Sequence, residues 1–587
     1  MVGTAALTAG LLALAPALAC ASVLPRNSEQ QCKADKKPNI VFIISDDQDM
    51  RQDSLGSMPR LQKLLVKEGT KFERFYSPIS ICCPSRSAFL RAQVAHSTNI
   101  TDVRAPYGGW PLFNEFGYNG HWLPSFLEQA EYDVRYVGKL MNGQTTNNTA
   151  ALPAQGLVDS AFLLDPHTYD FWNPAFSTPA GPVEYRFDEY SNDVVTEKAL
   201  KFLDDAAQSP DKPFFVGIAP IAPHSHIAWN DTSRAMQIPI PHPRHADMFP
   251  DAKLDRSRDS FNPDVPSGAS WVRKLDKLSD ENVEYIEDFY RARLQALQSV
   301  DEMVEQVVQK LEDMGVLDET MIIYTSDNGF ESNAGHRRQP GKTLPYEEDI
   351  NVPLVVRGPG VPKGKVDKTS VYSLTDLAAT ILHVSGAQAD FDHDGAVMPL
   401  THELRKRADW NGGAKQFHLS EYWVENVVEG KYAKSIETGN ATYRGVRVVE
   451  GDDIDYAYAV WCTNEHEIYD MKARLSCGVP FVLQRRIDAT CTCCAMQKDP
   501  NQMQNIALND LSPSSWHGRL HTRLDALLLV LKQCSGESCR NPWRSIFTNG
   551  KVTTLKQALD RKYDDYFAQL PRVKYDAEVS VEIVEQV

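Results

Sequence analysis

The sequence predicts an α/β fold, in which a large and mainly parallel sheet is flanked by helices and a smaller α+β subdomain follows. Short runs rich in β-branched residues recur along the chain, as expected for buried parallel strands. Helical patterns lie between several of these runs, and such alternation favours a parallel sheet. The alternation fades after about residue 395. We therefore expect a main domain at 36–395 and a smaller, Cys-rich subdomain at 396–587.

The individual elements follow from local patterns. The predicted strands are five apolar runs, Ile40–Ile44, Val134–Val137, Phe214–Ala219, Met321–Thr325 and Val352–Val356. The clearest helix is Asp280–Met314, because Ser279 can cap its start, acidic residues fill its first turn and Gly315 follows its end. A further helix is expected around Trp516–Gln533 in the C-terminal subdomain.

The first 21 residues read as a secretory signal peptide. Leu7–Ala19 is short and apolar, and it ends in the small-residue pattern Ala17-Leu18-Ala19. A membrane anchor is the alternative, although a span needs about 20 apolar residues. No later segment predicts stable membrane insertion. We therefore expect a secreted, extracellular protein, with a lysosome-like compartment as the alternative destination.

Two further patterns agree with export. The sequence has four N-glycosylation sequons, at Asn99, Asn147, Asn230 and Asn440. Cysteines are concentrated towards the C-terminus, at 462, 477, 491, 493, 494, 534 and 539, and in an exported protein this predicts disulfides. Zinc binding by Cys491-Thr-Cys493-Cys494 is the alternative, but no histidine pairs with this run at zinc-finger spacing.

Composition excludes one class of partner. The 587 residues include 78 acidic and 61 basic side chains, which gives a net charge of −17. A nucleic-acid-binding protein would show the opposite balance. An anionic small substrate stays compatible with this charge, because a local cationic pocket can lie inside an acidic protein.

Polar residues follow the predicted strands at the point where each strand ends. These are Asp46 and Asp47, Lys139, His224, and Asp327 with Asn328. In open parallel sheets the carboxyl ends of the strands meet at one edge, so these side chains can converge. The carboxylate and amide oxygens among them, from Asp46, Asp47, Asp327 and Asn328, suit a hard divalent cation such as Ca²⁺ or Mg²⁺. Each acidic pair alone could equally be a turn or a helix cap.

The most specific segment is Cys82-Cys83-Pro84-Ser85-Arg86. It places a nucleophile close to a guanidinium that favours anions, although a buried structural Cys pair or a disulfide partner would fit the same residues. The pattern Cys-x-Pro-Ser-Arg, followed by Ala88-Phe89-Leu90 and His96, closely resembles the signature of type I, formylglycine-dependent sulfatases. Arg91-Ala92 departs from that signature, which usually has Thr-Gly at this point.

The resemblance implies a fold, a modification and a metal. The fold would be the alkaline-phosphatase-like sulfatase fold, with residues 36–395 as the catalytic domain. A formylglycine-generating enzyme would oxidise Cys82, and the aldehyde hydrate would attack sulfur to form a covalent sulfate–enzyme intermediate. One Ca²⁺, or alternatively Mg²⁺, would be bound by Asp46, Asp47, modified Cys82, Asp327 and Asn328.

The resemblance also assigns roles to cationic residues. Lys139 and Lys342 match lysines that contact the sulfate, and His224 matches a histidine that binds the sulfate or the leaving group. Arg86 would hold the hydrate. Met141 stands where the family often has a histidine, so the proton-transfer or sulfate contact of that histidine is in doubt. The catalytic set expected from the family is therefore Cys82, Arg86, Lys139, His224 and Lys342.

The implied activity is hydrolysis of a sulfate ester, as in secreted arylsulfatases. Gly138-Lys139 and Ala222-Pro223-His224 lie in segments that are also similar to N-acetylglucosamine-6-sulfatases, so a glycosaminoglycan sulfatase is an alternative. Phosphonate or phosphate monoester hydrolysis by the same site is another, and an inactive secreted glycoprotein is the non-enzyme alternative. Residues 472–498, which the family pattern does not require, have no assigned role.

Overall fold

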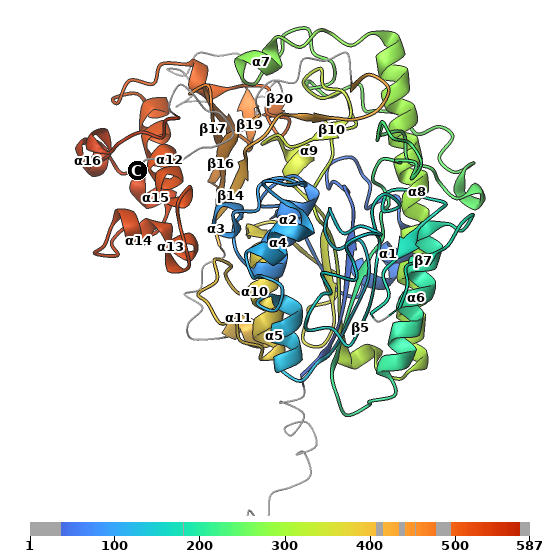
Figure 1. Ribbon diagram of the computed structural model, residues 1–587. Coiled ribbons are helices and arrows are strands. Elements are labelled where there is room, and N and C mark those ends of the chain that lie inside the picture. The colour runs from blue at the N-terminus through green and yellow to red at the C-terminus, as the bar shows by residue number, and fades with distance from the viewer. Residues whose placement is uncertain are drawn as a thin grey trace, which may run out of the picture. The chain divides into compact units, whose positions relative to one another are not determined.

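An eight-stranded sheet organises the first two thirds of the chain in the computed structural model, which describes residues 37–179, 181–406, 415–433, 441–451, 453–476 and 495–575 (Figure 1). The strand order is β12-β2-β11-β9-β1-β8-β4-β5. The strands span Asn39–Ser45 (β1), Thr70–Phe72 (β2), Asp133–Gly138 (β4), Asp159–Phe162 (β5), Phe214–Ala219 (β8), Thr320–Ser326 (β9), Leu354–Arg357 (β11) and Lys365–Asp367 (β12).

The prediction of a mainly parallel sheet is confirmed. Strands β9, β1, β8, β4 and β5 are parallel neighbours. Within this sheet β11 alone runs the other way, because it pairs antiparallel with both β9 and β2. Each of the five apolar runs picked out in the sequence overlaps a strand.

Helices cover both faces of the sheet. On one face lie α2 (Cys82–Arg91), α4 (Gly109–Glu115), α5 (Leu123–Gln129) and α10 (Leu374–Ser385), and on the other lie α6 (Ser191–Ala206) and α8 (Asp280–Asp313). Alternate residues of β1 enter the two cores, since Phe42 packs in the first and Val41 in the second. A strand buried on both faces needs an unbroken apolar run, which is the pattern seen.

The long helix α8 begins and ends close to where the sequence predicts. Ser279 accepts a hydrogen bond from the backbone N–H of Asn282, and the Asn282 side chain accepts one from the Ser279 N–H, so a capping box fixes the start. Gly315 follows the C-cap with φ of 70°, the left-handed conformation that glycine adopts without strain.

The C-terminal part contains a second, antiparallel sheet. Its order is β14 (Phe417–Tyr422), β16 (Tyr443–Glu450), β17 (Ile454–Trp461) and β18 (His466–Asp470). Helix α12 (Trp516–Leu531), predicted at Trp516–Gln533, packs on this sheet in one apolar core. Cys534 and Cys539 form a disulfide. The expected domain boundary near residue 395 stays a prediction.

Two small pairings matter for the site. Strand β10 (Gly341–Lys342) pairs antiparallel with β15 (Val427–Val428), so the C-terminal part supplies a neighbour for the segment that carries Lys342. Strands β19 (Ala473–Ser476) and β20 (Ala495–Lys498) pair at the two ends of the segment that has no assigned role.

Some sequence predictions fall outside the described residues. These are the signal peptide at 1–21, the sequon at Asn440, and the cysteines at 477, 491, 493 and 494 with their zinc alternative. In the parts of the chain that the structure describes, no helix combines the length and apolarity that a membrane crossing requires.

Candidate active site

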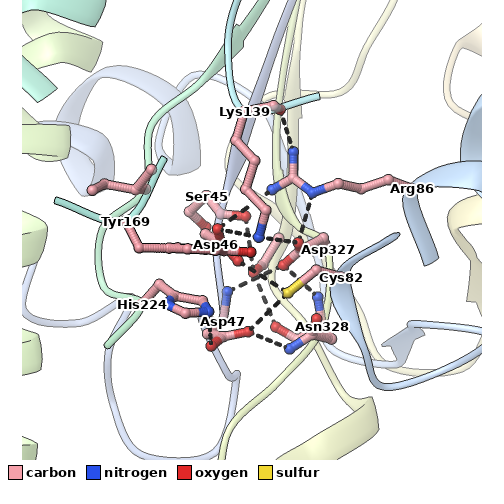
Figure 2. A network of polar contacts seen from close by, with 12 residues as sticks. Ser45, Asp46, Asp47, Cys82, Arg86, Lys139, Tyr169, His224, Asp327 and Asn328 are labelled. Carbon is pink, nitrogen blue, oxygen red and sulfur yellow. Dashed lines mark hydrogen bonds and ion pairs between the residues drawn. The ribbon is translucent and has the colours of Figure 1, made fainter. Parts of the chain in front are cut away.

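The polar residues that follow the strands converge at the carboxyl edge of the large sheet (Figure 2). Asp46 and Asp47 follow β1, Lys139 follows β4, and Asp327 with Asn328 follows β9. His224 lies on the loop after β8. All of these side chains are almost completely buried. The convergence that parallel strand ends predict is therefore present in the fold.

Cys82 is the first residue of α2 and faces this cluster. Its Sγ lies 3.6 Å from Asp46 Oδ1, 4.0 Å from Asp47 Oδ1 and 3.4 Å from Lys342 Nζ. Burial raises the pKa of the Cys82 thiol to about 12, although Lys139 and Lys342 oppose the rise. Within the described residues, neither Cys82 nor Cys83 takes part in a disulfide.

Arg86 lies one helical turn after Cys82 and therefore on the same face of α2. Its Nε donates to Asp327 Oδ2 at 2.7 Å, and its Nη1 donates to the carbonyl of Lys139 at 2.5 Å. The guanidinium thus connects the ends of two strands to the helix that carries Cys82.

Two lysines point into the cluster from different elements. Lys139 Nζ donates to Asp46 Oδ2 at 2.5 Å and lies 4.7 Å from the centre of the Tyr169 ring. Lys342 Nζ, from β10, donates to both oxygens of Asp47 at 2.6 and 2.7 Å. Attraction to the carboxylates outweighs burial and raises the pKa of both lysines well above the usual value.

The carboxylates stay ionised for the same reason. Burial opposes the charge of Asp47, but Lys342 and His224 outweigh it and lower the pKa of this carboxyl. Burial likewise opposes the charge of Asp327, and Arg86 with Lys139 lowers its pKa. The site therefore contains ion pairs between buried cations and buried carboxylates. A bound anion could attract the cations, and a bound metal cation could attract the carboxylates.

The donor set fits a hard divalent cation. Carboxylate oxygens of Asp46 and Asp47 lie within 4.8 Å of each other, of Cys82 Sγ and of a ring nitrogen of His224. Asn328 Nδ2 donates to Asp47 Oδ1 at 2.6 Å, whereas its buried Oδ1 has no hydrogen-bond partner among the residues that the structure describes. An unpartnered buried carbonyl oxygen beside carboxylates is the arrangement that Ca²⁺ or Mg²⁺ would complete.

His224 is fixed in one orientation. Its Nδ1 lies 2.8 Å from the carbonyl of Ser225, so Nδ1 is the donor and Nε2 is left to face Asp47 Oδ2 at 3.5 Å. The ring stacks on Tyr169 with centroids 4.1 Å apart, and Figure 2 shows the two side by side.

Two residues of this site, Tyr169 and Glu429, were not predicted from the sequence. The Tyr169 ring contacts both His224 and Lys139. Glu429 is completely buried, accepts a hydrogen bond from the hydroxyl of Ser225, and has Oε1 3.7 Å from Lys342 Nζ. Neither has a local sequence signal, because both reach the site through tertiary pairing.

Met141 occupies the position where the resemblance would put a histidine. It is buried, and its sulfur accepts a long contact of 3.7 Å from the Ser87 hydroxyl. A thioether has no proton to donate, so Met141 cannot replace a histidine in proton transfer.

Away from the site, the three sequon asparagines that the structure describes, Asn99, Asn147 and Asn230, are exposed.

Comparisons with known proteins agree with this geometry. The family model described as Sulfatase matches residues 38–387. An arylsulfatase of Volvox carteri is 34% identical over 565 residues, which cover 92% of this chain and 82% of that protein. The N-acetylglucosamine-6-sulfatase of Homo sapiens is 28% identical over 541 residues, covering 86% of each chain.

Other relatives extend the comparison to localisation and fold. A Caenorhabditis elegans relative, named a Sulf-1 homologue and extracellular sulfatase, is 30% identical over 363 residues, which cover 60% of this chain and 47% of that protein. The structure of BT4656 with its substrate D-glucosamine-2-N,6-O-disulfate superposes with a TM-score of 0.57 at 22% identity, covering 74% of this chain and 91% of that one.

This superposition shows the sulfatase fold, in agreement with the mixed sheet and the smaller antiparallel sheet described above. Both the family match and the 34% identical relative cover most of the chain. The chain therefore belongs to the sulfatase family, and it is a sulfuric ester hydrolase.

Proposed function

We propose that this protein is a secreted sulfatase that hydrolyses aryl or similar sulfate monoesters through a formylglycine made from Cys82. One observation carries the proposal: Cys82 Sγ lies inside a buried ring that contains three cationic side chains, Arg86, Lys139 and Lys342. A sulfate monoester is an anion, and charge grows on its oxygens in the transition state, so a preorganised cationic ring favours the reaction.

The proposed cation site consists of Asp46, Asp47, Asp327 and Asn328, together with the modified Cys82. The Oδ1 of Asn328, which has no hydrogen-bond partner among the described residues, supports this assignment. When bound, Ca²⁺, or Mg²⁺ as the alternative, would supply positive charge that stabilises developing negative charge. Formylglycine would supply an oxygen nucleophile with a second hydroxyl.

The remaining residues would bind and orient the substrate. Lys139 and Lys342, whose ammonium groups now contact Asp46 and Asp47, would turn to the sulfate oxygens. Arg86 would keep the first turn of α2 aligned with Asp327 and the Lys139 carbonyl. His224, with Nε2 directed into the site, would contact the leaving-group oxygen.

A second candidate keeps this site and changes the ester. The similarity to the human N-acetylglucosamine-6-sulfatase over 86% of this chain supports a sulfated sugar as substrate. Secretion is supported by the signal-like N-terminus, by the exposed sequons and by the relative named as extracellular. A formylglycine-generating enzyme would act on the chain during maturation.

The first test is the mass of the tryptic peptide Phe75–Arg86 from protein made in its native host. We expect a peptide lighter than the thiol form, because an aldehyde replaces the thiol of Cys82. A Cys83→Ser variant is the control and should keep the modification. If protein that is active on p-nitrophenyl sulfate carries a free thiol at residue 82, this result would contradict the proposal.

A second test removes one cation from the ring. Lys342→Ala should reduce kcat/KM for p-nitrophenyl sulfate by about 10² to 10³, as loss of one preorganised charge-stabilising group does in other enzymes. The control is Lys431→Ala, since Lys431 is an exposed lysine a few residues after β15 that pairs with Glu281. Equal activity of both variants would exclude the role given to Lys342.

A further inference from the structure

Three exposed aromatic rings and one buried histidine ring gather beside the candidate active site. We call them the aromatic platform: His167, Tyr185, Phe187 and Trp229. Tyr185, Phe187 and Trp229 are 46%, 51% and 37% exposed, which is unusual for such large apolar side chains. His167 stacks on Trp229 at 4.9 Å, and Tyr185 stacks on Phe187 at 5.7 Å. Phe187 lies 5.9 Å from Trp229, so the two stacks are in contact.

Hydrogen bonds from buried residues hold the platform in place. The buried carboxylate of Asp170 accepts the backbone N–H of Trp229 at 3.0 Å, and its other oxygen accepts the N–H of Trp172 at 2.9 Å. His167 Nδ1 donates to the carbonyl of Asn173 at 2.6 Å. Burial lowers the pKa of His167, so its ring is neutral at neutral pH. A rigid surface loses little entropy when it binds a ligand.

Two of the chain segments that build the platform, those of His167 and of Trp229, also build one wall of the site. His167 is two residues before Tyr169, and their Cα atoms are at most about 7 Å apart. Tyr169 stacks on His224 and lies 4.7 Å from Lys139 Nζ. The N–H of Ile227 donates to the Tyr169 carbonyl, which joins the segment between His224 and Trp229 to the segment between His167 and Tyr169. The platform is therefore continuous with the wall that contacts the sulfate site.

We propose that the aromatic platform binds the uncharged sugar rings of a sulfated oligosaccharide, next to the ring that carries the ester. This inference rests on the proposed function. The three exposed rings of the platform, Tyr185, Phe187 and Trp229, offer more surface than one aryl leaving group would cover. The flat faces of aromatic rings pack against the C–H faces of sugars, as they pack against other flat ligands.

The charges around the platform indicate uncharged rings rather than a run of sulfates. Arg186, which lies between Tyr185 and Phe187 in the sequence, is paired with Glu189 at 2.5 Å and with Glu197 at 2.9 Å. Its guanidinium is thus already neutralised by two carboxylates. Arg234, a second cation near His167, donates to the Pro166 carbonyl at 2.9 Å and lies 3.8 Å from the Asp165 carboxylate. Lys139 and Lys342, which could hold a sulfate, lie in the buried site. One sulfate in the site and neutral sugars on the platform is the arrangement that these charges favour.

The test measures binding by isothermal titration calorimetry to the full chain with Cys82→Ser, which lacks the proposed nucleophile. The probes are N-acetylglucosamine 6-sulfate and the β-1,4-linked N-acetylglucosamine trisaccharide that carries one 6-sulfate on its non-reducing end. We expect the trisaccharide to bind about tenfold more tightly than the monosaccharide. A tenfold gain in affinity corresponds to the binding free energy of about one stacked ring pair. Trp229→Ala should remove this advantage.

The matched control is Trp516→Ala, because Trp516 is 43% exposed at the start of α12 and lies outside the platform. It should keep the full trisaccharide advantage. Equal affinity for the two probes, or an advantage that persists in Trp229→Ala, would overturn the proposal. Because Asn230 is a sequon, the protein is also made with Thr232→Ala. An advantage seen only in that variant would mean that the chain's own glycan covers the platform, and this too would overturn the proposal.

The proposed function is tested separately by hydrolysis of p-nitrophenyl sulfate by the unsubstituted enzyme. If that hydrolysis is absent, the proposed function fails, whereas the calorimetry still decides whether the platform binds sugars. If the aryl ester is hydrolysed and the trisaccharide shows no advantage, the proposed function stands and the platform proposal fails.

Discussion

Ala92 ends helix α2 in the left-handed backbone conformation, with φ of 50°. This is the position where the sulfatase signature usually has glycine. A side chain with a Cβ is strained in this conformation by about 1 kcal/mol or more. We therefore expect Ala92→Gly to raise the free energy of unfolding by up to about 1 kcal/mol, measured by guanidinium denaturation.

Ala88→Gly, within the same helix, is the control for this prediction. It should lower the free energy of unfolding by about 1 kcal/mol, because glycine in a helix interior costs backbone entropy. If Ala92→Gly also destabilises the protein, then packing of the buried Ala92 methyl group outweighs the strain.

At the residue scale, the sequence predicts what is encoded locally. Asp46, Asp327 and Asn328 could be found because each directly follows an apolar strand. Lys342 was found through the resemblance and lies on a strand of two residues, too short for any pattern. Tyr169 and Glu429 could not be found, because ring stacking and a buried contact with Ser225 depend on chain segments that meet only in the folded protein.

Helix α8 supports the site as an element. Arg293, in its middle, donates to the carbonyl of Asp47 at 2.5 Å and lies 3.5 Å from the carboxylate of Asp49. The capping box at Ser279 fixes where this helix starts. We expect Ser279→Ala to lower the free energy of unfolding by about 1 kcal/mol, since it leaves the N–H of Asn282 without its side-chain acceptor.

Denaturant titration measures this change, and Ser209→Ala is the control, because Ser209 is an exposed serine in the turn after α6. The control should change stability by less than about 0.5 kcal/mol. Equal effects of the two substitutions would show that the cap of α8 does not contribute.

The elements themselves were predictable to different degrees. Strands β1, β4, β8 and β9 have both faces buried, so their apolar runs are unbroken and easy to find. The reversed direction of β11 was not predictable, because a run of apolar residues gives no information about strand direction. The four-stranded C-terminal sheet was expected only as an α+β region.

On the scale of the whole molecule, one buried carboxyl connects the C-terminal antiparallel sheet to the segment that follows β10. Glu467, on β18, accepts hydrogen bonds from Trp461 Nε1 at 2.9 Å, from the Tyr469 hydroxyl at 2.9 Å and from the Tyr346 hydroxyl at 3.4 Å. Tyr346 lies shortly after β10. Burial raises the pKa of Glu467 from its usual 4.5 to about 7.

A raised carboxyl pKa gives a defined pH dependence. Below pH 4.5 the carboxyl is protonated in both folded and unfolded chains, so its contribution to stability is fully present. As the pH rises to about 7, the unfolded chain ionises first, and this contribution is lost. We expect Glu467→Gln, which cannot ionise, to gain melting temperature relative to the unsubstituted protein between about pH 5 and pH 8.

Differential scanning calorimetry across that range checks this expectation. Glu403→Gln, an exposed glutamate on α11 (His402–Lys406), is the matched control. A difference between Glu467→Gln and the unsubstituted protein that stays constant with pH would refute the account of this carboxyl.

The position of β1 determines when the chain can fold. Ile40 pairs with Phe215 on one side and with Met321 on the other, so the first strand of the sheet has neither neighbour until much later in synthesis. Contacts this distant in sequence form slowly, and an unpaired apolar strand attracts other chains. Until residue 326 has left the ribosome, the segment Asn39–Ser45 is an aggregation risk. We therefore expect production of this protein to depend on chaperones that shield its first strand.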